Sequence, residues 1–228
     1  MSEKFNTITS QICVSQTNRM TFAAYSGLKM AAIEDFMELI SGKITLTLRD
    51  FSNGRGEKAV TAHYNLDIAD SEWIYEMSKP QNLRPQFEYF GTKIYGNNPV
   101  EGGPYNGLCK TFRIHVARRA LSQEGTQNFY PWSVSIVNGY ARANSGKVVG
   151  SFYEAKGSFR PEADLTMRFA DLEFFRLFRA IHEAIDRFTM LSSMNLIPAG
   201  LQRLETEQAK RAAKRENGMS PGFGQYAS

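Results

Sequence analysis

The stretch LTMRFADLEFFRLF, residues 165–178, decides the expected fold, because it indicates a β-strand that runs directly into an α-helix. Apolar residues alternate with polar ones as far as Phe169, which is the period of a half-buried strand. Asp171 then provides an acidic residue at the expected start of a helix. We expect this helix to end near Leu191 and to carry a core-facing apolar stripe made of Phe174, Phe175, Phe178, Ile181, Ile185 and Phe188.

An earlier stretch, YNLDIADSEWIYEM at residues 64–77, has the same order of strand, acidic residue and apolar helix. Aligned without gaps, the two stretches share an Ala-Asp pair and a glutamate, at Ala69, Asp70 and Glu72 and at Ala170, Asp171 and Glu173. Alternating segments that predict further strands precede both stretches. The chain is therefore predicted to be α+β, with two antiparallel strands-then-helix pseudo-repeats at about residues 43–80 and 105–191.

The segments outside these repeats complete the expected organisation. Residues 1–25 are polar and predict a flexible N-terminal segment. From Ser26 a helical spacing of apolar residues predicts an extra N-terminal helix that Gly42 ends, with Ile33, Phe36, Met37 and Ile40 on one face. Pro198 and Gly200 predict the end of a single domain that spans residues 26–200. Residues 201–228 predict a polar helix and a disordered tail.

The overall composition is that of a globular protein with a substantial core, since 42% of the 228 residues are hydrophobic and 22% are charged. No apolar run approaches the roughly 18 residues that a membrane span needs, and the N-terminus lacks the apolar core of a signal peptide. Cys13 and Cys109 form no metal-binding spacing or disulfide framework. We therefore expect a cytoplasmic protein with no membrane segment, no metal and no other cofactor.

Positive charge is concentrated in one part of the chain. Residues 105–160 contain eight Lys or Arg residues and two Glu, a net charge of +6, whereas the whole chain carries +4. Nine aromatic residues are interleaved with these cations. A sheet surface with this composition either is a solvated basic face or binds a polyanion.

Single-stranded nucleic acid offers flat bases and a charged backbone, and aromatic faces together with Lys or Arg side chains bind both. The predicted nucleic-acid-binding residues are Lys43, Arg49, Arg113, His115, Tyr130, Trp132, Tyr140, Arg142, Lys147, Tyr153, Lys156 and Arg160. Trp132 shares a strand face with apolar neighbours, so the sequence leaves open whether it stacks on bases or lies in the core. Tyr153 is expected to point outward and Phe152 inward.

The segments KITLTLRDFSNGRGEKAVTAHYNLDIADSEW, FYPWSVSIVNGYARANSGK, GSFYEAKGSF and LTMRFADLEFFRLF together resemble the Whirly and positive-cofactor-four-like single-stranded DNA-binding proteins, of the kind that conjugative elements or phages carry. The resemblance extends over about residues 43–188. It implies a sequence-independent protein that coats single-stranded DNA during replication or transfer. It also implies association into higher oligomers, although pairing of the two halves within one chain allows either a monomer or a homo-oligomer.

Other functions remain open at this point. An RNA-binding regulator of the same fold would carry the same surface chemistry, and a non-catalytic structural protein needs no ligand at all. The strongest enzyme motif is YEAKG, in which Glu154 and Lys156 match part of a metal-dependent nuclease strand, but no aspartate occurs between Asp70 and Asp164. We expect a protein that is not an enzyme.

Overall fold

The computed structural model describes residues 10–30, 40–122, 124–148 and 150–218, with side chains described as far as Lys210. The chain divides into two compact units. The first comprises residues 1–28 and 42–185, and the second comprises residues 29–41 and 186–218 within a segment that continues to residue 228. The predicted class is confirmed, because the described chain is α+β with antiparallel sheets and a C-terminal helix.

The first sheet is a four-stranded antiparallel meander that is followed directly by a helix. Its strands lie in the order β1-β2-β3-β4, with bounds Gln11–Gln16, Met20–Met30, Ile40–Asp50 and Val60–Asp67. Alternation buries Ile44, Leu46 and Leu48 on one face, while the intervening residues of β3 are partly or fully exposed. Helix α2, Ile68–Ser78, begins where β4 ends.

The second sheet has the order β10-β7-β6-β5. In the sequence, a small separate hairpin lies between its strands β7 and β10. The bounds of its strands are Gln86–Pro99 for β5, Cys109–Arg119 for β6, Trp132–Ala141 for β7 and Arg160–Phe169 for β10. The hairpin between β7 and β10 consists of β8, Ala143–Ser145, and β9, Phe152–Glu154. Helix α3, Asp171–Gly218, follows β10. Short 3-10 turns occur at Gly56–Lys58, Pro80–Asn82 and Gly103–Tyr105.

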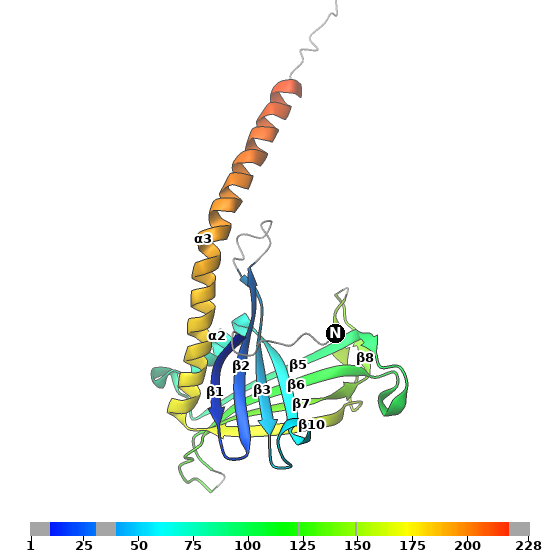
Figure 1. Ribbon diagram of the computed structural model, residues 1–228, viewed down its shortest axis with the longest axis vertical. Helices are drawn as coiled ribbons and strands as arrows, with labels where there is room; N and C mark the ends of the chain where they lie inside the picture. Colours follow the sequence, from blue (N-terminus) through cyan, green and yellow to red (C-terminus); the bar gives the residue numbers. More distant parts are fainter. Residues whose placement is uncertain (1–9, 31–39, 123, 149, 219–228) are drawn as a thin grey trace, which may run out of the picture. The chain divides into compact units, whose positions relative to one another are not determined.

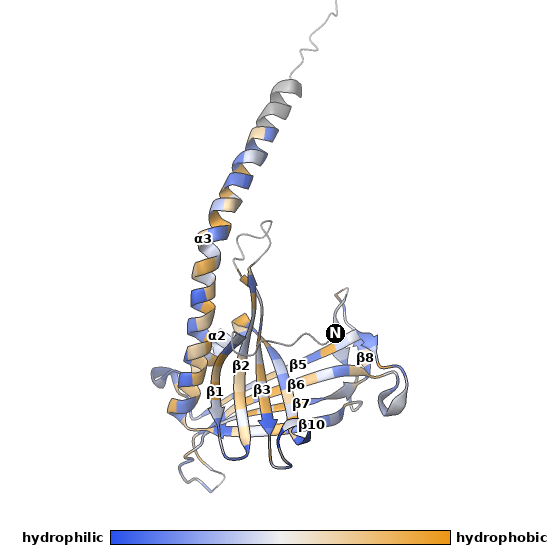
Figure 2. Cartoon of the chain, viewed as in Figure 1, coloured by the Kyte–Doolittle hydropathy of each residue, from blue (hydrophilic) through white to orange (hydrophobic). Residues whose placement is uncertain are grey.

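The core of the first unit lies between the two sheets, whose strands cross one another (Figure 1). Phe22 of β2 meets Phe169 of β10 edge to face, with ring centroids 5.5 Å apart. Figure 2 shows the corresponding mixture of hydrophobic and hydrophilic residues along the strands of the second sheet. Since each strand presents one apolar face, packing the two sheets together removes the apolar face of each sheet from water.

Trp132 and Phe174 join the second sheet to the first turn of α3. Their rings stack with centroids 4.0 Å apart, and neither side chain is exposed. Asp171 lies in that first turn, where its carboxylate accepts two hydrogen bonds of 2.8 Å from the guanidinium of Arg118. These hydrogen bonds are the main reason that the pKa of Asp171 lies below its ordinary value. The residue predicted as a helix cap therefore anchors α3 to β6.

The predicted N-terminal helix is not found in the described residues. Ser26 to Met30 belong to strand β2 and Ile40 begins β3, whereas Ile33, Phe36 and Met37 lie outside the described residues. Gly42, expected to end that helix, has φ 108° inside β3, where a Cβ atom would lie 2.2 Å from the carbonyl oxygen of Gly27. The close approach of two strands, rather than a helix end, accounts for this glycine.

Two predicted segment boundaries also differ from the structure. Residues 11–25, expected to be flexible, form β1 and most of β2, and Phe22 has no exposed surface. Helix α3 continues through Pro198 and Gly200 to Gly218 instead of ending near Leu191. A proline inside a helix removes one backbone donor and need only kink the helix, because the neighbouring hydrogen bonds remain. The predicted polar helix is thus the last part of α3, and the predicted tail lies outside the described residues.

We predict that Phe178→Asp unfolds the first unit. Phe178 is fully buried and its ring lies 4.7 Å from that of Phe174, so the variant loses the packing of a large aromatic ring and buries an unpaired carboxylate. The expected loss is at least about 3–5 kcal/mol. Thermal unfolding followed by circular dichroism measures it, with Leu172→Asp at an exposed position of the same helix as the control. Equal stability of the two variants would contradict the described packing.

We also predict that truncation after Gly200 leaves the first unit folded. Every residue from Leu201 to Lys210 is exposed, so deletion of this part of α3 removes no buried side chain among those described. The melting temperature should remain within a few degrees of that of the full chain. A truncated protein that fails to unfold cooperatively would show that these residues are needed for folding.

Candidate functional site

The twelve predicted binding residues do not form one surface. Trp132 is in the core, stacked on Phe174, so the prediction that it contacts nucleic acid is wrong. Its strand face is the buried one because Val134 and Ile136 on the same face are also buried. The other eleven residues are at least partly exposed; ten of them lie in four separate places, and Lys43 lies apart from these.

The first place is the β8–β9 hairpin and its flanks. Arg142, Lys147 and Lys156 are exposed there, and Tyr153 is 56% exposed, whereas Phe152 packs against β5, 2.2 Å from where a Cβ atom on Gly96 would lie. The expected orientation of the Phe152–Tyr153 pair is therefore confirmed. This hairpin presents cations and one aromatic ring to solvent.

Arg113 fastens the hairpin to the second sheet. Its guanidinium donates to both carboxylate oxygens of Glu154, with an Nε–Oε2 distance of 3.1 Å, and lies 3.8 Å from the ring centre of Phe159. A bidentate pair with a stacked ring is a strong structural contact. Arg113 is therefore engaged within the protein, and the Glu154 carboxylate invoked for a nuclease is used in the same contact.

His115 occupies the second place, on the face of the second sheet that points away from the core. Its ring stacks on Phe90 of β5, with centroids 4.1 Å apart and an interplanar angle of 6°. Phe90 is 66% exposed, so the stacked pair forms a small aromatic patch on this open face. Burial of its ring lowers the pKa of His115.

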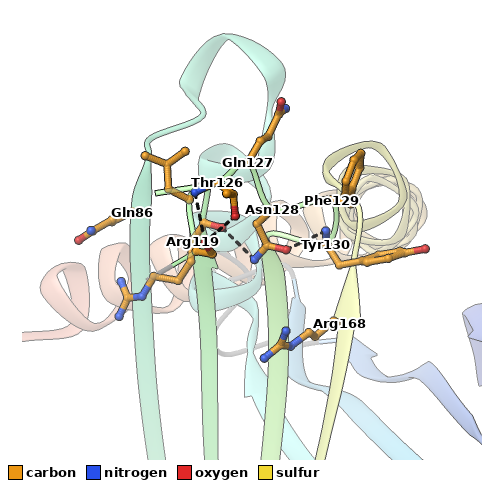
Figure 3. Close-up of a pocket in the computed structure, with 10 residues that line it drawn as sticks. Gln86, Arg119, Thr126, Gln127, Asn128, Phe129, Tyr130 and Arg168 are labelled. Carbon is orange, nitrogen blue, oxygen red and sulfur yellow. Dashed lines mark hydrogen bonds between the residues drawn. The ribbon is translucent and has the colours of Figure 1, made fainter. Parts of the chain in front are cut away.

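The third place contains Tyr130 alone of the predicted residues. It is 58% exposed and lines a pocket beside the β6–β7 loop, at the far end of the same open face (Figure 3). Arg119 and Arg168 line the same pocket, although neither was among the predicted residues.

The fourth place brings an aromatic residue and two cations side by side across three strands. Tyr140 of β7 pairs with Lys110 of β6 on one side and with Arg160 of β10 on the other. Cross-strand partners point to the same face of a sheet, so the three side chains form one row. Tyr105 stacks on Tyr140 with centroids 4.1 Å apart, and the guanidinium of Arg160 donates to the carbonyl of Pro104 at 3.3 Å.

A pocket of about 420 Å³ opens beside this row. Tyr95, Lys110, Phe112 and Tyr140 line it, and Tyr95 is 47% exposed. The ring of Phe112 meets that of Tyr95 edge to face at 5.5 Å. The pocket therefore has aromatic walls with a cation at its rim.

Strand β4 of the first sheet forms the other side of this region. His63 lies with its ring 4.9 Å from that of Phe112, and the amide of Asn65 donates to the hydroxyl of Tyr95 at 3.5 Å. Thr61, next on the same face, accepts a hydrogen bond of 3.2 Å from Nε of Arg49. We call this region the corner surface; it consists of Arg49, Thr61, His63, Asn65, Tyr95, Tyr105, Lys110, Tyr140 and Arg160.

The charge of the corner surface is predominantly positive. Among the described residues, no carboxylate pairs with Arg49, Lys110 or Arg160. Lys43, the remaining predicted residue, lies at the other end of β3 and pairs with Asp67, which also binds Lys93 at 2.8 Å. The structure thus brings Arg49, Tyr140 and Arg160 of the predicted set into one region and leaves Lys43 outside it.

Sequence reasoning missed Lys110, Tyr95 and Tyr105 as members of this region. Lys110 was counted in the basic segment, but only the register of β6 against β7 places it beside Tyr140. Tyr105 lies in a 3-10 turn within a loop rich in Gly and Pro, which has no periodicity to predict where the side chain points.

Comparison with protein-family models, curated proteins and solved structures found no significant match to this chain. No helix in the described part of the chain carries an apolar stretch that could cross a membrane. Within the described residues, no group of three or more His, Cys, Asp or Glu side chains is arranged to hold a metal ion.

We predict that the protein loses stability as the pH falls from 7.5 to 5.5. Burial lowers the pKa of His63 and of His115, and the nearby charge of Lys110 lowers that of His63 further. Each of these two imidazoles therefore binds a proton more weakly in the folded protein than in the unfolded chain. Their contribution to the free energy of unfolding is present above the ordinary histidine pKa of about 6.5 and is lost as the pH falls below it.

Thermal unfolding at several pH values measures this effect. The decrease in melting temperature over this range should be smaller in His63→Gln, whatever the absolute stability of that variant. An identical pH dependence in the wild type and in the variant would contradict the assignment to His63.

Proposed function

We propose that the protein binds single-stranded DNA without sequence preference and that the corner surface is its main binding site. The observation that carries the proposal is the row Lys110–Tyr140–Arg160, in which one aromatic ring lies between two cations without carboxylate partners in the described chain. Bases and phosphates alternate along a single strand. Such a row can therefore stack one base on the aromatic ring while the two cations bind the adjoining phosphates.

The neighbouring residues extend the same chemistry. Tyr95 offers a second, half-exposed ring beside the pocket, and Arg49 provides a cation on the opposite side of β4. Stacking and phosphate contacts depend little on which base is present, which supports binding without sequence preference. Duplex DNA keeps its bases inside the helix, so we propose that the site favours single strands.

The order of elements also supports a Whirly-like arrangement, which we propose for the finer topology. Four strands followed by α2 precede a second set of four sheet strands followed by α3, with the β8–β9 hairpin inserted before β10. In this proposal the two halves are pseudo-repeats, and the protein coats single strands that arise during replication or transfer of a mobile element.

We predict that Tyr140→Ala weakens binding to oligothymidine about 5- to 150-fold, the range expected for loss of one stacked base. Lys110→Gln and Arg160→Gln should each weaken binding and reduce the slope of log affinity against log salt by about 0.7, because each removes one phosphate contact. Fluorescence anisotropy at about 0.1 M salt, followed by a salt titration, measures both effects.

The matched control is Arg176→Gln, which removes an exposed arginine from α3. The start of this helix packs on Trp132, at the opposite end of β7 from Tyr140. This variant should leave affinity and salt slope unchanged. Equal binding of single- and double-stranded DNA, or equal loss in the control variant, would refute the proposal. Preferential binding of oligouridine would instead favour the RNA-binding alternative.

A further inference from the structure

A second pocket lies far from the corner surface and has a different composition. It has a volume of about 740 Å³, and its lining includes two arginines and three large apolar or aromatic side chains, namely Arg119, Arg168, Leu121, Phe129 and Tyr130. Figure 3 shows both arginines extending from the strands beside the loop that carries the aromatic residues. The volume falls within the range of small-molecule sites in proteins. We call it the loop pocket.

The loop pocket and the corner surface are on opposite faces of the second sheet. Arg119 and Lys110 are nine residues apart on β6, and an odd separation on a strand places side chains on opposite faces. The same separation corresponds to roughly 30 Å along the strand. A ligand in the loop pocket therefore does not occupy the row formed by Lys110, Tyr140 and Arg160.

Hydrogen bonds hold the backbone that carries the exposed aromatic residues of the loop pocket. Asn128 is central, because its backbone N–H donates to Ala120 at 2.9 Å, its side-chain amide donates to Arg119 at 3.3 Å, and its side-chain oxygen accepts from the N–H of Tyr130 at 3.1 Å. Phe129, between two residues fixed in this way, is nevertheless 83% exposed. A loop whose backbone is already ordered has less conformational freedom to lose when a ligand covers its aromatic side chains.

The loop pocket also contains two cations, Arg119 and Arg168. Arg168 projects from the open face of β10, and no carboxylate among the described residues pairs with it. Arg119 forms an exposed ion pair with Glu88, which contributes little and can rearrange when an anion binds. Two arginines that line the same pocket as a tyrosine and a phenylalanine suit a ligand that has both a phosphate and a flat ring.

We propose that the loop pocket binds a nucleoside monophosphate group, with the phosphate bound by Arg119 and Arg168 and the base against Tyr130. Two sources present this chemistry, namely a free nucleotide and the phosphorylated end of a single strand. The site is additional to the corner surface, and its existence does not depend on binding of DNA there.

Isothermal titration calorimetry of the full chain with deoxyadenosine monophosphate tests the proposal. Saturable binding is expected, with inorganic phosphate binding at least about tenfold more weakly because it lacks the ring. Arg168→Gln and Tyr130→Ala should each reduce the affinity about tenfold or more. Arg176→Gln, at an exposed position of α3 that lines neither the loop pocket nor the pocket of the corner surface, is the matched control and should leave the affinity unchanged.

A comparison of oligothymidine with a 5′-phosphate or a 5′-hydroxyl distinguishes the two sources. Tighter binding of the phosphorylated strand, lost in Arg168→Gln, identifies a strand end, whereas equal binding together with saturable mononucleotide binding identifies a free nucleotide. Absence of mononucleotide binding, equal affinity for inorganic phosphate, or unchanged affinity in both Arg168→Gln and Tyr130→Ala would overturn the proposal. If Arg168→Gln misfolds, Arg168→Lys, which keeps the charge but loses the planar fork, is expected to show a smaller loss.

Discussion

The side chain of Asn138 makes two hydrogen bonds on which the arrangement of the binding region depends. Its Oδ1 accepts from the backbone N–H of His63, and its Nδ2 donates to the carbonyl of the same residue, each at 2.7 Å. Strand β4 is the edge of the first sheet, so these backbone groups have no partner strand on that side. Asn138 is only 7% exposed and lies on β7, and it therefore fixes where the edge of one sheet crosses the other.

The corner surface follows from this crossing. With His63 held over β7, its ring lies against Phe112, and Asn65, two residues further along β4, reaches Tyr95. Beyond the edge of β4 the second sheet is no longer covered by the first, and the row of Lys110, Tyr140 and Arg160 occupies that uncovered part. The same face of the sheet thus supplies core residues such as Ile114 and Ile136 and, further along the strands, the proposed ligand contacts.

Local pattern predicted the class of the fold and several of its elements, while tertiary pairing determined the rest. The alternation in β3, β4, β6 and β10 and the apolar stripe of α3 are strong periodic signals, and the structure contains all of these elements. In the described part of the helix expected after Ser26, residues 26–30 and 40–42, pairing between β2 and β3 outweighs the helical spacing. Trp132 is apolar and aromatic, which fits a core and a stacking site equally well, and only its contact with Phe174 decides between them.

The candidate site was predictable only in its chemistry. The excess of Lys, Arg and aromatic residues between positions 105 and 160 is visible in the sequence, but the partners of each cation are not. Arg113 binds Glu154, Arg118 binds Asp171 and Arg119 binds Glu88, so three of the eight cations of this segment are engaged in ion pairs. Which cations remain available depends on strand register, and register is set by contacts between residues that are far apart in the chain.

Photo-crosslinking tests the central claim most directly. Oligodeoxyuridine that carries 5-iodouracil, bound to the full chain and irradiated, forms bonds to aromatic residues that stack on its bases, and mass spectrometry of the peptides identifies them. The corner surface predicts cross-links at Tyr95, Tyr105 and Tyr140. Cross-links confined to Tyr153 in the hairpin or to Phe129 and Tyr130 in the loop pocket, with none at those three tyrosines, would contradict it.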